Sequence, residues 1–206
     1  MPHTLPDLPY PYDALEPHMD KRTVEIHHDL HHGGYVTKLN NAIKDHPEVD
    51  AMDLDSLLLN IGKLDPGIQT PVRLNGAQHW NHTFYWESMA PGKGGTPEGD
   101  LLKAIEKDFK SLEEFKTLFQ NTSIAQFGSG WGWLYGSKDG KLRVKSTSNE
   151  GTPFMDGETP LLVVDVWEHA YYLKYKNRRD EFISSWWNLV DWDRVAQRFR
   201  AWKENK

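Results

Sequence analysis

The chain has 206 residues, of which 38% are hydrophobic and 26% are charged, as is typical of a folded protein with one large domain or two small ones. It contains no cysteine, which excludes disulfides and thiolate sites, and its formal net charge of −6 argues against a dominant nucleic-acid-binding surface. No apolar run approaches the ~20 residues that a membrane-spanning helix needs, so we expect neither nucleic acid nor membrane as a partner.

The N-terminal segment, residues 1–18, is rich in proline. We expect it to run as an extended arm that packs through its leucine and tyrosine side chains. The segment lacks the basic start, the apolar core and the small-residue cleavage site of a signal peptide. We therefore expect an intracellular protein, located in the cytoplasm.

Residues 20–44 have a helical pattern with two faces. The apolar stripe consists of Val36, Leu39 and Ile43. The polar stripe consists of His27, His31 and Tyr35, at i, i+4 and i+8. The pair Gly33-Gly34 costs on the order of 1 kcal/mol per glycine relative to alanine, so we expect a bend there or a closely packed neighbour.

A second histidine-bearing helix is predicted over residues 69–89, after a short helix over residues 53–62. Gln78, His82 and Trp86 recur on it at i, i+4 and i+8. Because both long helices carry a stripe of this kind, we expect them to face each other as a hairpin.

The run Pro91-Gly92-Lys93-Gly94-Gly95 is the clearest linker, so we expect two domains, 1–92 and 93–206. A helix is predicted to begin at Thr96-Pro97-Glu98, with proline at its first position. Ser111 and Glu114 form a capping box at the start of the next helix.

Strand patterns follow. Residues 131–135 and 141–146 flank Asp139-Gly140, which is typical of a hairpin turn, and residues 161–165 supply a third strand. Helices are expected again over 169–177, 180–189 and 191–202. The expected fold is α+β: an N-terminal long α-helical hairpin domain and a C-terminal α/β domain with a small three-stranded antiparallel sheet.

Three widely separated segments carry side chains that bind metals. Asp165 leaves the end of the third strand and His169 follows four residues later, so both could face one ion, with His27 and His82 as further donors. Three imidazoles and a carboxylate suit iron, manganese or zinc better than copper(I) or calcium. Ten histidines in such a chain also produce these spacings by chance.

Five segments resemble the signatures of the iron/manganese superoxide dismutase family, in order along essentially the whole chain. They are Glu25-Ile26-His27-His28, His31-His32-x-x-Tyr35, Asn81-His82-Thr83-Phe84-Tyr85-Trp86, Phe127-Gly128-Ser129-Gly130-Trp131 and Asp165-Val166-Trp167-Glu168-His169-Ala170-Tyr171-Tyr172. The resemblance implies an enzyme that converts two superoxide anions to dioxygen and hydrogen peroxide. One Fe or Mn ion per subunit, between the two domains, would change its charge by one electron in each half-reaction.

The resemblance also implies roles for individual residues. The metal ligands would be His27, His82, Asp165 and His169, with a solvent molecule as the fifth ligand. His31 and Tyr35 would line the substrate funnel, and Gln78 would hydrogen-bond the solvent ligand. Trp131 would belong to an apolar wall of tryptophans, with Trp80, Trp86, Trp133 and Trp167. Glu168 would reach the partner's His169 across a two-fold interface, which implies a homodimer and leaves a tetramer possible.

Some positions depart from the family pattern. Leu30 stands where members commonly carry a lysine, which leaves Arg179 as the candidate positive charge of the funnel. Glu150 stands where manganese-selective members place a glutamine, and with Gln78 present this favours iron or a metal-flexible site. Two alternatives remain: a metal phosphohydrolase, suggested by His28-Asp29, and an interaction module that has kept the fold.

Overall fold

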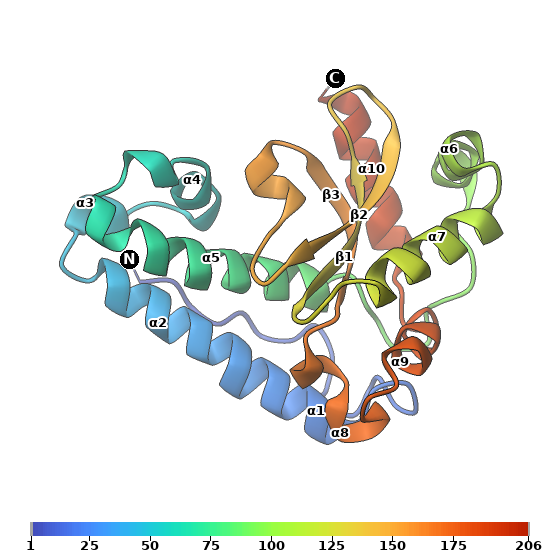
Figure 1. Cartoon of the computed structure of the whole chain (residues 1–206), viewed down its shortest axis with the longest axis horizontal. Coiled ribbons are helices and arrows are strands. Elements are labelled where there is room, and N and C mark those ends of the chain that lie inside the picture. The colour runs from blue at the N-terminus through green and yellow to red at the C-terminus, as the bar shows by residue number, and fades with distance from the viewer. Residues whose placement is uncertain (1, 206) are drawn as a thin grey trace.

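The computed structural model describes residues 2–205, apart from the side chain of residue 50. In the N-terminal part, one long helix is followed by short helices and a second long helix (Figure 1). These elements are α1 (Lys21–Glu25), the π-helix η1 (Ile26–His32), α2 (Gly33–Ile43), α3 (Pro47–Asp50), α4 (Leu54–Leu59), the 3-10 helix η2 (Ile61–Lys63) and α5 (Pro66–Trp86). No helix of the described chain is long and apolar enough to cross a bilayer.

The helices α2 and α5 pack side by side in opposite directions, which confirms the predicted hairpin (Figure 1). Leu39 and Ile43, from the predicted apolar stripe, are fully buried in the cluster that also contains Val72 of α5. Gly76 of α5 leaves room for Leu58 of α4, because a Cβ there would lie only 3.1 Å from that side chain. The hairpin is thus held by apolar contacts on one face of each helix.

The first long helix is not regular. Ile26–His32 is π-helical, so this stretch has more residues per turn than the α-helical segments on either side. A Cβ on Gly33 would lie 3.5 Å from Leu5 of the N-terminal arm, so the arm packs closely where the sequence placed its glycine pair. π-helical turns often occur at functional sites, and this one carries four histidines.

The C-terminal part contains the predicted three-stranded antiparallel sheet, and its strand order is β2-β1-β3. Its elements are α6 (Gly99–Phe109), α7 (Leu112–Ile124), β1 (Gly130–Gly136), β2 (Leu142–Ser148), the 3-10 helix η3 (Pro153–Asp156), β3 (Thr159–Asp165), the 3-10 helix η4 (Glu168–Ala170), α8 (Tyr172–Tyr175), α9 (Arg179–Trp186) and α10 (Trp192–Glu204).

Two predicted helix starts had different outcomes. Ser111 accepts a hydrogen bond from the Glu114 backbone N–H, which confirms that cap. The prediction of Pro97 as a first helical residue was wrong: α6 begins at Gly99, whose φ of +60° favours glycine, and Glu98 is the N-cap. The helix expected over 169–177 is interrupted, because the backbone of Tyr171 leaves the helical region between η4 and α8.

The two faces of β1 have different partners. A Cβ on Gly132 would collide with Ser123 of α7, and one on Gly136 would collide with Trp202 of α10. Trp131 and Trp133 alternate with these glycines and therefore point to the opposite face, where their rings contact side chains of α5. Strand alternation thus places indoles between the sheet and the helical hairpin.

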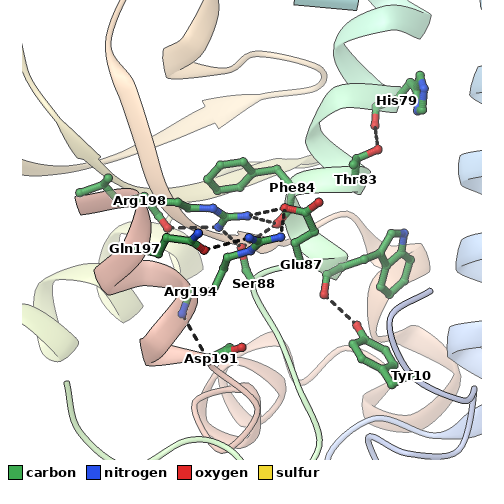
Figure 2. A network of polar contacts seen from close by, with 12 residues as sticks. Tyr10, His79, Thr83, Phe84, Glu87, Ser88, Asp191, Arg194, Gln197 and Arg198 are labelled. Atoms are coloured by element: carbon green, nitrogen blue, oxygen red, sulfur yellow. Dashed lines mark hydrogen bonds and ion pairs between the residues drawn. The ribbon is translucent and has the colours of Figure 1, made fainter. Parts of the chain in front are cut away.

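A largely buried arginine fixes the last helix to the end of α5 (Figure 2). Arg198 of α10 donates to Ser88 Oγ at 2.8 Å and to the Leu161 carbonyl at 3.2 Å, and it pairs with Glu87 at 3.3 Å. Its guanidinium lies 3.4 Å from the ring centroid of Phe84. Burial lowers the pKa of Arg198 to about 10, although Glu87 opposes the shift. The end of the hairpin and the C-terminal helix are therefore joined close to the linker, whose Lys93 pairs with Asp193 of α10 at 2.6 Å.

Candidate metal centre

Four side chains from four elements converge between the hairpin and the sheet. They are His27 of η1, His82 of α5, Asp165 at the end of β3 and His169 of η4, and one ligand atom from each lies within 4.8 Å of the others. Measured from Asp165 Oδ2, the three Nε2 atoms lie at 3.1 Å, 3.8 Å and 3.3 Å, for His27, His82 and His169 respectively. The structure thus brings together the ligand set that the resemblance implies.

Local hydrogen bonds orient two of these side chains. Asp165 Oδ1 accepts a hydrogen bond of 2.7 Å from the Trp167 backbone N–H, which leaves Oδ2 toward the imidazoles. His82 Nδ1–H donates to the Gln78 carbonyl at 2.7 Å, one helical turn earlier. Because this bond uses the Nδ1 proton, the Nε2 lone pair of His82 is free to bind a cation.

The donors fit a metal ion. Within the described chain, Nε2 of both His27 and His82 is buried without a hydrogen-bond partner, and the 3.1 Å approach of His27 to Asp165 lacks hydrogen-bond geometry. Burial, and after it neighbouring imidazoles, holds the pKa of both histidines well below the usual range. A metal cation bound between these neutral imidazole nitrogens and the carboxylate oxygen would give each of them a partner. A set of nitrogen and oxygen donors of this kind suits iron or manganese.

His31 and Tyr35 lie beside the four converging side chains and are partly exposed. The His31 ring stacks on that of His169, with 4.2 Å between the ring centroids. Burial lowers the pKa of His31 to about 4, and the charge of His169 is the second cause of this shift. The centroid of the Tyr35 ring lies 5.3 Å from that of His82. Burial raises the pKa of Tyr35 to about 12, and the negative charge of Asp165 is the second cause of this shift. At neutral pH the imidazole is therefore neutral and the phenol keeps its proton.

Gln78 is buried one turn before His82. Its side chain hydrogen-bonds Tyr35, which opposes the rise in the pKa of that phenol, and its Oε1 has no partner in the part of the chain described. The amide is thus held next to Tyr35, and its bond to a solvent ligand stays a prediction.

Three of the five expected wall tryptophans contact rings of the candidate ligands. Trp131 lies edge-on to His82 at 5.0 Å, Trp86 lies 4.7 Å from His27, and Trp167 stacks on His169 at 5.4 Å. The remaining two, Trp133 and Trp80, are placed farther out, behind Trp131. The apolar wall therefore has an inner and an outer layer.

Sequence reasoning missed the carbonyl that positions two of these indoles. The Asn149 carbonyl accepts hydrogen bonds from Trp131 Nε1 at 2.9 Å and from Trp167 Nε1 at 3.0 Å. The adjacent Glu150 carbonyl accepts one from Asn81 Nδ2, and the Glu150 carboxylate pairs with Arg73 at 2.8 Å. Ser-Asn-Glu-Gly after a strand is a recognisable turn signal, but only the packing shows which side chains its carbonyls meet.

A second histidine pair was also missed. Trp86 Nε1–H donates to His32 Nδ1 at 3.3 Å, so His32 Nε2–H donates to His79 Nδ1 at 2.7 Å. The His32 ring stacks on that of His82, with 5.2 Å between the ring centroids, and therefore supports a candidate ligand. The i, i+4 spacing of His28 and His32 was the available signal.

The departures noted in the sequence have structural counterparts. Leu30 is 66% exposed, so its side chain supplies surface but no charge. Arg179 donates to the Gly128 carbonyl at 2.9 Å and to the Tyr171 hydroxyl at 3.1 Å, which ties down a loop. A cation that the sequence analysis did not single out lies nearer the funnel: Lys38 Nζ is 5.7 Å from the Tyr35 ring centroid.

The pair that suggested a phosphohydrolase has a different role. His28 Nε2 donates to the Pro6 carbonyl at 2.8 Å, and His28 Nδ1 lies 2.7 Å from Asp29, whose carboxylate also accepts from Tyr12. These bonds hold the N-terminal arm against η1. In the described residues, the one group of side chains that could hold a metal is the four-residue cluster above.

Comparisons with known proteins agree with this geometry. Residues 2–90 match the family model of the α-hairpin domain of iron/manganese superoxide dismutases, and residues 97–198 match that of the C-terminal domain. The chain is 49% identical over 203 residues to a protein of Listeria monocytogenes named superoxide dismutase [Mn], covering 98% of this chain and all of the relative. Proteins of the same name from Pseudomonas aeruginosa (48% over 199 residues, 97% of this chain and 98% of the relative) and Thermus thermophilus (47% over 198 residues, 96% and 97%) are also similar.

Proposed function

Since the chain belongs to the iron/manganese superoxide dismutase family and is a superoxide dismutase, we propose that His27, His82, Asp165 and His169 are the ligands of its Fe or Mn ion. The observation that supports this assignment is that the unpartnered Nε2 atoms of His27 and His82 converge with His169 Nε2 on Asp165 Oδ2. When bound, the ion supplies one-electron chemistry between its divalent and trivalent states, so that one superoxide becomes dioxygen and a second becomes hydrogen peroxide.

The residues around the ion control charge and protons. The buried Asp165 carboxylate favours the more highly charged state of the ion, and the indole wall lowers the local dielectric, which strengthens every fixed hydrogen bond. Tyr35 keeps its proton over the whole physiological range because its pKa is raised to about 12, and it is therefore available as a hydrogen-bond donor to an arriving anion. Peroxide formation needs protons, and Tyr35 lies between the ligands and solvent.

We propose that Lys38 takes over the electrostatic steering that Leu30 does not provide. Its ammonium group is exposed one turn beyond Tyr35 on α2, and its charge contributes to the lowered pKa of His31. A positive charge at the entrance raises the local concentration of an anionic substrate and acts less strongly at high salt. The rate constant of Lys38→Gln should fall at low ionic strength and approach that of the wild type at high ionic strength.

For the metal we propose a site that works with either ion, with iron favoured by Gln78. The relatives' names point to manganese, whereas the buried Gln78 amide beside Tyr35 is the feature that favours iron. Metal analysis of the purified protein, followed by activity after reconstitution with each ion alone, tests this. Activity with one ion only would reject a metal-flexible site.

We also propose a cytoplasmic homodimer, with a tetramer as the larger alternative. Glu168 is exposed in the single chain although it lies between Trp167 and the ligand His169, a placement that suits a contact with a partner subunit. Sedimentation measures the assembly, and fractionation of cells measures the compartment.

A further inference from the structure

Three indoles form a row that leads away from the metal centre. Trp131 lies 5.0 Å from the ligand His82, Trp133 lies 6.3 Å from Trp131, and Trp80 lies 6.5 Å from Trp133, measured between ring centroids. The first two rings are fully buried in β1, whereas Trp80 of α5 is only partly buried. The row therefore connects the innermost part of the molecule with its surface.

The indole N–H groups have different partners along the row. Trp131 donates to the Asn149 carbonyl at 2.9 Å and Trp133 to Thr147 Oγ1 at 2.8 Å, both neutral oxygens. Trp80 donates at 2.8 Å to Oδ1 of Asp55, an exposed carboxylate. A negative charge next to an indole stabilises its oxidised cation and offers a base for the N–H proton. Trp80 is thus the easiest of the three to oxidise.

The surroundings of Trp80 suit a place where an oxidised ring is held and then reduced. Its ring is stacked between Phe84 at 5.1 Å and Phe154 at 4.7 Å, which keeps it in one orientation. Trp80, Asp55 and Phe84 line a surface cleft of about 360 Å³, so a small molecule can reach the indole. Aromatic walls with a few polar groups are suited to a small phenol.

We propose that Trp131, Trp133 and Trp80, with Asp55, form a protective relay that carries an oxidising equivalent from the metal centre to this cleft, where a phenol reduces it. The need for such a relay follows from the enzyme's own product. This inference rests on the proposed iron-loaded form of the enzyme: one-electron reduction of hydrogen peroxide, chemistry that divalent iron would supply there, gives hydroxide and a hydroxyl radical beside the proposed ligands.

The electrons and protons balance as follows. The hydroxyl radical takes one electron from Trp131 and becomes hydroxide, Trp133 returns an electron to Trp131, and Trp80 returns one to Trp133. The Trp80 N–H proton moves to Asp55 and leaves a neutral indolyl radical. The phenol then gives one electron to Trp80, Asp55 returns the proton to Nε1, and the phenol loses its own proton to water as it becomes a phenoxyl radical.

Other aromatic contacts of the centre lack this combination. Trp167 stacks on His169 but donates to the neutral Asn149 carbonyl. Tyr12 does donate to a carboxylate, Asp29, but its ring contact toward the centre is the imidazole of His28, which is harder to oxidise than an indole. The Trp80 row joins indoles throughout and ends on a carboxylate.

The test exposes the enzyme loaded with iron alone to hydrogen peroxide. Rapid-freeze electron paramagnetic resonance detects radicals, and peptide mass spectrometry locates oxidised tryptophans. In wild type we expect a neutral indolyl radical that is lost in Trp80→Phe, and oxidation products concentrated at Trp80. Asp55→Asn, which touches no proposed ligand, should keep the dismutase rate, lose the neutral radical and move oxidation inward to Trp131 and Trp133.

Two comparisons complete the design. Added phenol should suppress oxidation of Trp80 in wild type and yield phenol-coupling products. Trp187→Phe, a buried indole in the separate aromatic cluster beside α7, is the matched control and should behave as wild type. Identical radical signals and oxidation patterns in wild type, Asp55→Asn and Trp80→Phe would overturn the relay. Because dismutation is measured on the same samples, that result would leave the enzyme's function untouched.

Discussion

At the scale of single residues, His82 shows how little redundancy the centre has. Its Nε2 is one of four donors supplied by separate elements, and no other group of metal-binding side chains occurs in the described chain. We expect His82→Ala to lose bound metal and dismutation together, because the remaining donors leave one side of the ion open. Metal content and superoxide removal are measured side by side. His46→Ala, in the loop after α2, is the control, and full metal occupancy in His82→Ala would show that the ligand set is wrong.

Gln78 tests the tuning of the centre. If its amide donates to a solvent ligand, Gln78→Ala should keep the fold and the metal but shift the reduction potential by roughly 60–130 mV, the equivalent of one charge-assisted hydrogen bond. Activity with iron and with manganese should then change unequally. Potentiometric titration of both metal forms provides the measurement, with Gln69→Ala, an amide near the start of α5, as the matched variant. An unchanged potential would assign Gln78 to packing alone.

The buried imidazole of His79 should make the free energy of unfolding depend on pH. Burial lowers the pKa of His79 to about 4, and the charge of His3 is the second cause of this shift. In an unfolded chain the pKa of a histidine is near 6.5. Between these values the unfolded chain binds more protons, so the contribution of His79 to the free energy of unfolding is complete above pH 6.5 and is lost as pH falls toward 4. The full effect is on the order of 3 kcal/mol.

The variant His79→Gln, which keeps a hydrogen-bond acceptor for His32, should weaken this acid-side loss. Denaturant unfolding of wild type and variant at several pH values between 4 and 7 measures the difference. His46→Gln should retain the wild-type slope. Equal slopes in all three proteins would mean that His79 is as accessible to protons in the folded state as in the unfolded state.

At the scale of elements, β1 packs closely on both faces because glycines and tryptophans alternate along it. A Cβ on Gly132 would collide with Ser123 and lie 3.0 Å from Val164 Cγ1. We expect Gly132→Ala to destabilise the protein by about 1–3 kcal/mol or more, because α7 must move away from the strand that carries Trp131. Thermal and denaturant unfolding give the value.

The counterpart on the helical side is Gly34. A Cβ there has no neighbour within 4 Å among the described residues, and the residue lies inside α2. Gly34→Ala should therefore stabilise the protein by roughly 0.5–1 kcal/mol through its helix propensity alone. If Gly132→Ala also stabilised the protein, the close approach of α7 to β1 would not limit the size of the residue at position 132.

At the scale of the whole molecule, the proposed homodimer predicts that Glu168 couples association to metal retention. If Glu168 is buried against the partner's His169, Glu168→Ala should weaken the dimer by about 3–5 kcal/mol and speed up metal loss, because a charge-assisted bond loses one member. Sedimentation equilibrium and metal release into a chelator measure the two effects. Glu204→Ala, on the exposed end of α10, is the control. A wild-type protein that sediments as a monomer would refute the coupling.

Side-chain periodicity and turn chemistry determined much of this protein from its sequence. The i, i+4 stripes identified both long helices, and Asp139-Gly140 identified the hairpin of β1 and β2. The motifs around His27, His82 and Asp165 indicated the family and the residues that converge. These signals are local, because each depends on neighbours within a few positions along the chain.

Tertiary structure decided the features that depend on distant segments. The π-helical turn of η1, the start of α6 at Gly99 and the Asn149 carbonyl that serves two indoles were not predicted. The Asn149 carbonyl, for example, accepts hydrogen bonds from Trp131 and Trp167, which belong to other segments of the chain. No local pattern records which carbonyl will face which indole, since that is fixed only when the hairpin and the sheet close around the centre.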